Sequence, residues 1–210
     1  MWHKVSPIAW RIGQNRTWSS TGYFDRRDYA AGVTLDIMIR DFVKNFLRGI
    51  PVGNIYITHS DSGIRVAVHT SKVSLVLGKN GEQQMKLEAE LLRTFGQVIK
   101  VDVKEIKNPD THAAIIADSI ARQIERRLPY RRVIKQALAK AIEKWAKGIK
   151  VKVSGRINGV DIARKETYKE GNIPSQSIKS HIDYVIEEAH TTYGVICLLY
   201  TSDAADDVEC

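Results

Sequence analysis

Gly78-Lys79-Asn80-Gly81 is the most informative part of this 210-residue sequence. It separates a short apolar segment at residues 73–77 from residues 85–92, where apolar side chains recur at helical spacing. Two glycines let a backbone approach a phosphate without a Cβ in the way, the following helix presents its first N–H groups, and Lys79 adds a charge. The turn is suited to clamping a nucleic-acid backbone, although an ordinary helix–helix turn can also have this pattern.

The elements around this turn follow a recognisable order. Apolar periodicity predicts a helix, two β-rich runs, two further helices and a strand, at residues 36–49, 55–58, 64–69, 73–77, 85–92 and 99–104. The order α-β-β-α-α-β resembles the prokaryotic-type KH domain, a fold that clamps nucleic-acid backbones with a G-x-x-G loop. We therefore expect a KH domain over residues 36–107.

A second domain is expected over residues 108–196, after the turn signal Asn108-Pro109-Asp110. Two helical patterns meet at Pro129, and the apolar face of the second runs from Val133 to Trp145. Alternating strands follow, with Asn158-Gly159 as a two-residue hairpin signal. The sequence thus predicts an α+β fold class: a KH domain, then an α+β domain with two helices and an antiparallel sheet.

Residues 1–35 are expected to form an irregular basic arm. Its cations are Lys4, Arg11, Arg16, Arg26 and Arg27, and its aromatic residues are Trp2, Trp10, Trp18, Tyr23 and Phe24. Interleaved cations and aromatic rings suit a segment that lies along RNA. The alternative is that the aromatic rings anchor the arm to the body of the protein.

The net charge favours a polyanionic partner. The whole chain carries +8, but the last fourteen residues contain four acidic side chains and no Lys or Arg. Residues 1–196 therefore carry +12, with 32 basic against 20 acidic side chains. Nucleic acid is the commonest partner of so basic a protein, and a basic enzyme with scattered surface charge is the alternative.

Six cations lie within fourteen residues around Pro129: Arg122, Arg126, Arg127, Arg131, Arg132 and Lys135. Arg127 ends a helix, where a cation suits the helix dipole, whereas Arg131 and Arg132 open the next helix, where it does not. Arg131 and Lys135 are four residues apart and share one face. A solvated charged face is the usual fate of such a run. Because the dipole and mutual repulsion oppose this placement, we expect contact with RNA.

Several function classes are disfavoured. Both cysteines, Cys197 and Cys210, lie in the last fourteen residues, so residues 1–196 offer no disulfide framework and no cysteine-based zinc site. Phosphate-loop, dinucleotide, hydrolase and zinc-protease motifs are missing, and the six histidines are dispersed. No apolar run reaches the roughly 18 residues that cross a bilayer. We expect a soluble, intracellular protein with no catalytic residue, metal, cofactor or membrane partner.

Motifs along the chain resemble a ribosomal family, the bacterial-type third protein of the small subunit. They are Lys4-Val5-Ser6-Pro7, Arg11-Ile12-Gly13, Gly78 to Gly81, Ala117-Asp118-Ser119-Ile120, Glu125-Arg126-Arg127, Arg131-Arg132, Ala146 to Val151, Val153 to Arg156 and Glu188 to Gly194. The resemblance implies a non-enzymatic component of the small-subunit head, in the cytoplasm, that binds 16S-type rRNA, mRNA and neighbouring head proteins. It also implies that Arg131, Arg132 and Lys135 line the place where mRNA enters its channel and help to open mRNA helices.

The RNA-binding residues expected from all of this are Gly78, Lys79, Asn80, Gly81, Arg127, Arg131, Arg132 and Lys135. Two other classes stay open as alternatives: a free KH-domain regulator of messenger or small RNA, and a nucleic-acid-processing enzyme. The arm and the cations around Pro129 favour the ribosomal interpretation, and no positioned nucleophile or base supports an enzyme. Whether the turn at Gly78 binds mRNA or only rRNA is not decided by the sequence.

The last residues depart from the family pattern. From Cys197 onward the chain is acidic and contains no Lys or Arg, and it resembles translated adapter sequence joined to a truncated reading frame. We expect residues 197–210 to be a non-native, poorly packed tail that replaces the last strand of the C-terminal sheet.

Overall fold

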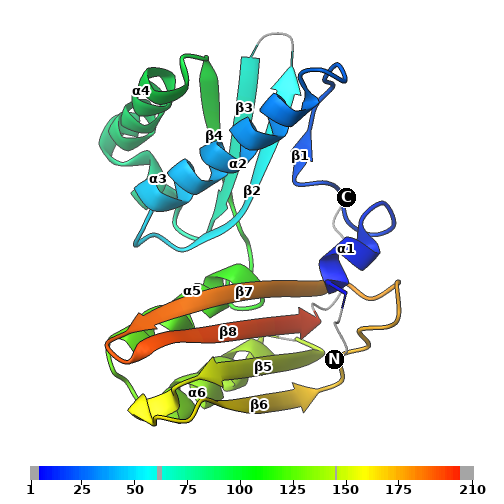
Figure 1. Cartoon of the computed structure of the whole chain (residues 1–210), viewed down its shortest axis with the longest axis vertical. Helices are drawn as coiled ribbons and strands as arrows, with labels where there is room; N and C mark the ends of the chain where they lie inside the picture. The colour runs from blue at the N-terminus through cyan, green and yellow to red at the C-terminus, as the bar shows by residue number, and fades with distance from the viewer. Residues whose placement is uncertain (1–4, 61–62, 145, 204–210) are drawn as a thin grey trace. The chain divides into compact units, whose positions relative to one another are not determined.

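The computed structural model describes residues 5–60, 63–144 and 146–203. They form two compact units, Trp18–Lys107 and a second unit that joins residues 5–17 to the chain from Asn108 onward. Each unit consists of a four-stranded sheet with helices packed on it (Figure 1). The α+β class predicted from the sequence is confirmed.

The first unit has the predicted KH order. Its helices are α2 (Tyr29–Phe46), α3 (Val73–Leu77) and α4 (Glu82–Phe95), and its strands are β1 (Ser20–Thr21), β2 (Val52–Ser60), β3 (Gly63–Thr70) and β4 (Ile99–Glu105). The sheet order is β1-β2-β3-β4. β2 and β3 are antiparallel, and β4 lies parallel to β3. The succession α2-β2-β3-α3-α4-β4 confirms the KH prediction.

Side-chain alternation explains why these segments fold in this way. In β3, Ile64, Val66 and Val68 are buried, whereas Arg65 between them is exposed, as expected for a strand with one buried face. Helix α2 contributes Ile39 and Val43 to the same core at helical spacing, and the other helices add further aliphatic side chains. Burial of these aliphatic groups holds the turn between α3 and α4 at a fixed place beside the sheet.

The second unit is a sheet with two helices on one face (Figure 1). Its main elements are α5 (Ala113–Glu125), α6 (Tyr130–Glu143), β5 (Gly148–Gly155), β6 (Arg164–Gly171), β7 (Ile182–Thr191) and β8 (Gly194–Asp203). The strand order is β6-β5-β8-β7, and every pair is antiparallel. The predicted pair of helices and antiparallel sheet are confirmed.

The connection from β5 to β6 is longer than the two-residue hairpin predicted from Asn158-Gly159. Both residues have the positive φ values that this signal requires, 59° and 77°. They lie, however, in a 3-10 turn, η2 (Ile157–Gly159), and β6 begins only at Arg164. The side chain of Ile157 is buried in the core, which holds the turn against the body and lengthens the loop.

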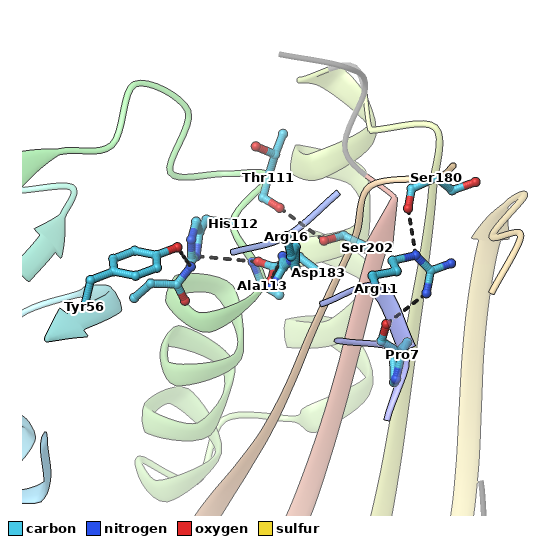
Figure 2. A network of polar contacts seen from close by, with 11 residues as sticks. Pro7, Arg11, Arg16, Tyr56, Thr111, His112, Ala113, Ser180, Asp183 and Ser202 are labelled. Atoms are coloured by element: carbon cyan, nitrogen blue, oxygen red, sulfur yellow. Dashed lines mark hydrogen bonds and ion pairs between the residues drawn. The ribbon is translucent and has the colours of Figure 1, made fainter. Parts of the chain in front are cut away.

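The expectation of an irregular N-terminal arm is wrong for three parts of it, although residues 12–19 and 22–28 form no helix or strand. Residues Pro7–Arg11 form the short helix α1, residues Ser20–Thr21 pair with β2 as β1, and α2 begins at Tyr29, before the predicted start at Asp36. Arg11 is fully buried. Its guanidinium donates hydrogen bonds to the backbone carbonyls of Pro7 and Ser180 (Figure 2). It also donates to the carbonyls of Ser175 and Ser177. The arm is fixed because these carbonyls satisfy a buried cation.

The other arm residues divide between internal contacts and solvent. Arg16 pairs with Asp183 at 2.6 Å. Arg11 and Arg16 are therefore engaged within the protein, whereas the sequence suggested that they contact RNA. Phe24 packs its ring edge-on against His59, which is the anchoring alternative. Trp10, Trp18 and Tyr23 are exposed. Trp2, Lys4 and Trp145 lie outside the described residues.

The expected poorly packed tail is wrong for residues 197–203. They belong to β8, a central strand that pairs with β5 on one side and β7 on the other. Ile196, Leu198 and Tyr200 alternate into the core beneath the helices. The alternation therefore continues past Cys197, where the sequence led us to expect that the last strand was absent. Residues 204–210 lie outside the described residues.

Candidate nucleic-acid interface

Both glycines of the turn between α3 and α4 have a positive φ, but their surroundings differ. Gly78 has φ 71° and ψ −170°, and a Cβ there would lie 2.8 Å from Cγ of Gln83. Gly81 has φ 80°, and an added Cβ would meet no atom within 4 Å. Gly78 is thus required by close packing, whereas Gly81 faces open space that a ligand backbone could occupy.

The positive charge of this turn comes from Lys79, whose side chain is exposed. Residues Lys79–Gly81 form one 3-10 turn, η1, which places Lys79 and the backbone of Asn80 directly before α4. Glu82 in the first turn of α4 is itself favoured by the helix dipole. The side chain of Asn80 lies outside the described atoms.

The cations around Pro129 lie where α5 ends and α6 begins. Arg126 is the C-cap of α5, and Arg127 follows in the left-handed conformation with φ 62°. The N–H of Leu128 donates to the carbonyl of Gln123 at 3.1 Å, which completes a Schellman motif. A residue other than glycine pays about 1 kcal/mol or more for this conformation. The motif turns the chain sharply and leaves the side chains of Arg126 and Arg127 in solvent.

We call Arg126, Arg127, Arg131, Arg132 and Lys135 the Pro129 surface; all five are exposed. For four of them, all except Arg131, no side-chain hydrogen bond or ion pair with another described residue is found. Arg122 does not join this surface, because its guanidinium pairs with Asp118 at 2.6 Å within α5. Arg127, Arg132 and Lys135 are therefore exposed cations for which no ion pair within the described residues is found, and their contact with RNA stays a prediction.

Arg131 is different, because it has a partner within the protein. Its Nε donates to Tyr130 Oη at 3.0 Å, and its Nη2 lies 3.6 Å from Glu166 Oε1 on β6. The first turn of α6 has no acidic residue of its own. Glu166 supplies a negative charge beside it, so the placement of Arg131 at a helix start is compensated inside the fold.

Glu166 is held by two tyrosines. Tyr168 donates to Glu166 Oε2 at 2.7 Å, and Tyr130 donates at 3.1 Å. The hydrogen bond from Tyr168, followed by that from Tyr130 and the nearby arginines, lowers the pKa of the Glu166 carboxyl. Burial, and then the hydrogen bond to Glu166, raises the pKa of Tyr168 to about 12. The carboxylate stays ionised and the phenol protonated at neutral pH, which preserves this contact.

Sequence reasoning missed Glu166 and its neighbour Arg164. Arg164 Nε lies 3.3 Å from Glu166 Oε1, so the two side chains meet on one face of β6. Their spacing of two residues in a strand was the available signal. This spacing could not be linked to Arg131, because the sequence does not show the strand register that places β6 beside α6.

Other kinds of site are not evident in the part of the chain that is described. It contains no group of three or more His, Cys, Asp or Glu side chains that could hold a metal ion. None of its helices is long and apolar enough to cross a membrane. A cavity of about 350 Å³ in the second unit is lined by Lys147, Asn172, Pro174, Lys179, Ser180, His181 and Asp203. None of the predicted RNA-binding residues lies in its wall.

The Gly78–Gly81 turn and the Pro129 surface belong to different units, and each is a candidate surface in its own unit. Both units match known families: a KH domain at residues 38–111, and the C-terminal domain of ribosomal protein S3 at residues 120–198. The chain is 42% identical to small ribosomal subunit protein uS3 of Shewanella amazonensis over 196 residues, 93% of this chain and 85% of that protein. It is 40% identical to the uS3 of Cupriavidus pinatubonensis and 41% to that of Bordetella avium, each over 93% of this chain and 74% of the relative. The chain belongs to the uS3 family of small ribosomal subunit proteins.

Proposed function

We propose that this protein binds 16S-type rRNA in the head of the small ribosomal subunit and lines the place where mRNA enters its channel. The observation that carries the proposal is the Pro129 surface, where four exposed cations have no acidic partner among the described residues. Such a concentration of unpaired Lys and Arg on one part of a basic protein is the electrostatic signature of nucleic-acid binding. The relatives are named as small ribosomal subunit proteins, which supports a structural role in the ribosome rather than an enzyme activity.

The KH turn supplies a second contact. Gly81 leaves room for a phosphate group, and Lys79 adds a charge next to it. In this proposal the turn binds the backbone of an RNA strand, because KH domains clamp such a backbone with a loop of this pattern. Neighbouring head proteins are the remaining partners in this proposal.

Any role in opening mRNA helices is passive. The sequence contains no motif for nucleotide hydrolysis, so this protein has no energy source of its own. The cations of the Pro129 surface hold the phosphates of strands as they separate, while translocation of the ribosome supplies the pull. This assigns Arg131, Arg132 and Lys135 a role that depends on charge and position only.

The test compares ribosomes that carry different variants of the full chain. Arg131, Arg132 and Lys135 are replaced together by Gln, and the matched control replaces Lys150, Lys165 and Lys169, which the strand register places on the opposite face of the sheet from the helices. Translation is timed on an mRNA with a stable hairpin and on an unstructured one. We expect slowing on the hairpin alone and only for the Pro129 variant. Equal slowing on both messengers would contradict helix opening.

A second measurement separates the ribosomal role from that of a free regulator. A tagged chain in a cell extract is expected to sediment with small subunits. A persistent pool at low mass, with no co-sedimenting fraction, would favour the regulator.

A further inference from the structure

We infer that Arg164, on β6, is an additional RNA-contacting residue of the Pro129 surface, held beside Arg131 by Glu166. The inference rests on the proposed function, because it extends the surface assigned to RNA from α6 onto the neighbouring edge strand. Glu166 is the positioning residue in this arrangement, since it reaches RNA only through the two arginines that it holds.

The geometry brings the two guanidinium groups to the same pair of acceptors. Arg164 Nε and Arg131 Nη2 lie 3.3 Å and 3.6 Å from the same carboxylate oxygen, Glu166 Oε1. Both also contact Tyr130 Oη, Arg131 through Nε at 3.0 Å and Arg164 through Nη2 at 3.5 Å. Two positive charges close to one oxygen repel each other, and a shared anion between them offsets that repulsion. Glu166 is that anion.

Exposure shows which way the cluster faces. The side chains of Arg131 and Arg164 are 64% and 46% exposed, whereas that of Glu166 is 21% exposed. The carboxylate therefore lies beneath the arginines, and each guanidinium keeps donors that face solvent. One carboxylate against two guanidinium groups leaves a surplus positive charge. Arginine donors in this arrangement suit a phosphate, which accepts two parallel hydrogen bonds from one guanidinium.

The base of the cluster is rigid. Tyr130 is buried at the first position of α6, and its hydroxyl donates to Glu166 at 3.1 Å. Tyr168 donates to the other carboxylate oxygen at 2.7 Å. A cation held in place by packed neighbours loses less side-chain entropy when it binds a phosphate than a cation on a free side chain does.

Strand register separates Arg164 from the lysines next to it. Glu166 pairs with Val153 and Tyr168 with Val151, whose side chains are buried under the helices. Arg164, Glu166 and Tyr168 thus share the helix-covered face of the sheet, and Lys165 lies on the opposite face. Lys165 is exposed and adjacent in sequence, so it provides a control with the same change in charge.

The experiment measures the affinity of the full chain for an RNA duplex with a single-stranded overhang, over a range of salt concentrations. Arg164→Gln is expected to weaken binding about tenfold. It is also expected to make the negative slope of log affinity against log salt shallower by about 0.7–0.9, the value for one lost phosphate contact. Lys165→Gln is expected to leave the slope unchanged. Arg164→Lys, which keeps the charge, is expected to retain the slope. Equal effects of Arg164→Gln and Lys165→Gln would overturn the inference.

Two further variants separate the possible outcomes. Arg132→Gln tests the Pro129 surface itself: if it weakens binding while Arg164→Gln does not, only the present inference fails. If neither variant weakens binding, the proposed RNA contact fails as well. Glu166→Gln is expected to weaken binding although it makes the protein more positive, because the arginines lose their positioning residue. Stronger binding by Glu166→Gln would show that Glu166 merely competes with phosphate, and would overturn its positioning role.

Discussion

The carboxylate of Asp183 on β7 accepts a hydrogen bond of 2.9 Å from the backbone N–H of Ala113, the first residue of α5. The N-cap of this helix, His112, makes no side-chain capping bond of its own. Arg16 of the arm binds the other carboxylate oxygen at 2.6 Å (Figure 2). A single buried carboxylate therefore joins the arm, the sheet and the start of α5.

Replacing this carboxylate should destabilise the second unit. Asp183→Asn leaves the Arg16 guanidinium without its counter-ion, and we expect a loss of about 3 kcal/mol in the free energy of unfolding. Urea denaturation followed by circular dichroism measures this loss. Asp161→Asn is the matched control, because Asp161 pairs with Arg156 while its own side chain is 98% exposed. Exposed pairs contribute at most about 1 kcal/mol, so equal losses in the two variants would contradict the account.

The contribution of Asp183 should also depend on pH. Burial by itself raises the pKa of this carboxyl, but the charges of protonated His112 and of Arg16, with the N–H of Ala113, outweigh it and lower the pKa. A lowered pKa gives stability that is fully present above the unfolded value of about 3.9 and is lost as the pH falls through the folded value. The stability difference between wild type and Asp183→Asn should therefore be present at pH 5 and shrink as the pH falls below about 4. A difference that grows as the pH falls below about 4 would contradict this assignment.

Strand β8 offers a test of the C-terminal sheet. Leu198 is buried in the core, whereas Leu199 lies on the opposite face and is partly exposed. Leu198→Ala should cost about 3 kcal/mol of stability, and Leu199→Ala clearly less, because only the first leaves a cavity in the core. Thermal unfolding of the two variants checks this. Similar small losses for both would mean that residues 197–203 do not pack as the central strand.

The KH turn can be tested with an isosteric pair. Gly81 has a positive φ that Asn and Asp tolerate better than most residues, and its surroundings are open. Gly81→Asp and Gly81→Asn should therefore fold equally well. The carboxylate should repel a phosphate, so we expect Gly81→Asp to bind RNA several times more weakly than Gly81→Asn in a filter-binding assay. Equal affinities would remove this turn from the RNA contact.

The sequence was sufficient for the order of elements, because apolar side chains with clear periods mark most helices and strands. It was not sufficient for the start of α2. Gly32 occupies a buried position in that helix, and a Cβ there would lie 2.7 Å from the ring of Phe24. A glycine at a core position interrupts the apolar period, so the first turns of the helix were assigned to the arm.

Long-range partners explain the remaining differences. Arg11 belongs to a stretch whose composition suggested an RNA-binding arm, yet its acceptors Ser175, Ser177 and Ser180 lie more than 160 residues away in sequence. Glu166 is likewise distant from Arg131 in sequence and becomes its neighbour only through the register of β6. Charge patterns show which residues are cationic. They do not show which cations the fold itself neutralises.

The most direct test of the RNA contact at the Pro129 surface uses the two cations of α6 that lack a partner among the described residues, Arg132 and Lys135. The affinity of the full chain for a 16S-type rRNA helix is measured across salt concentrations, for wild type and for the double variant Arg132→Gln/Lys135→Gln. Loss of two phosphate contacts should make the negative slope of log affinity against log salt shallower by about 1.4–1.8. An unchanged slope in a folded double variant would contradict the account.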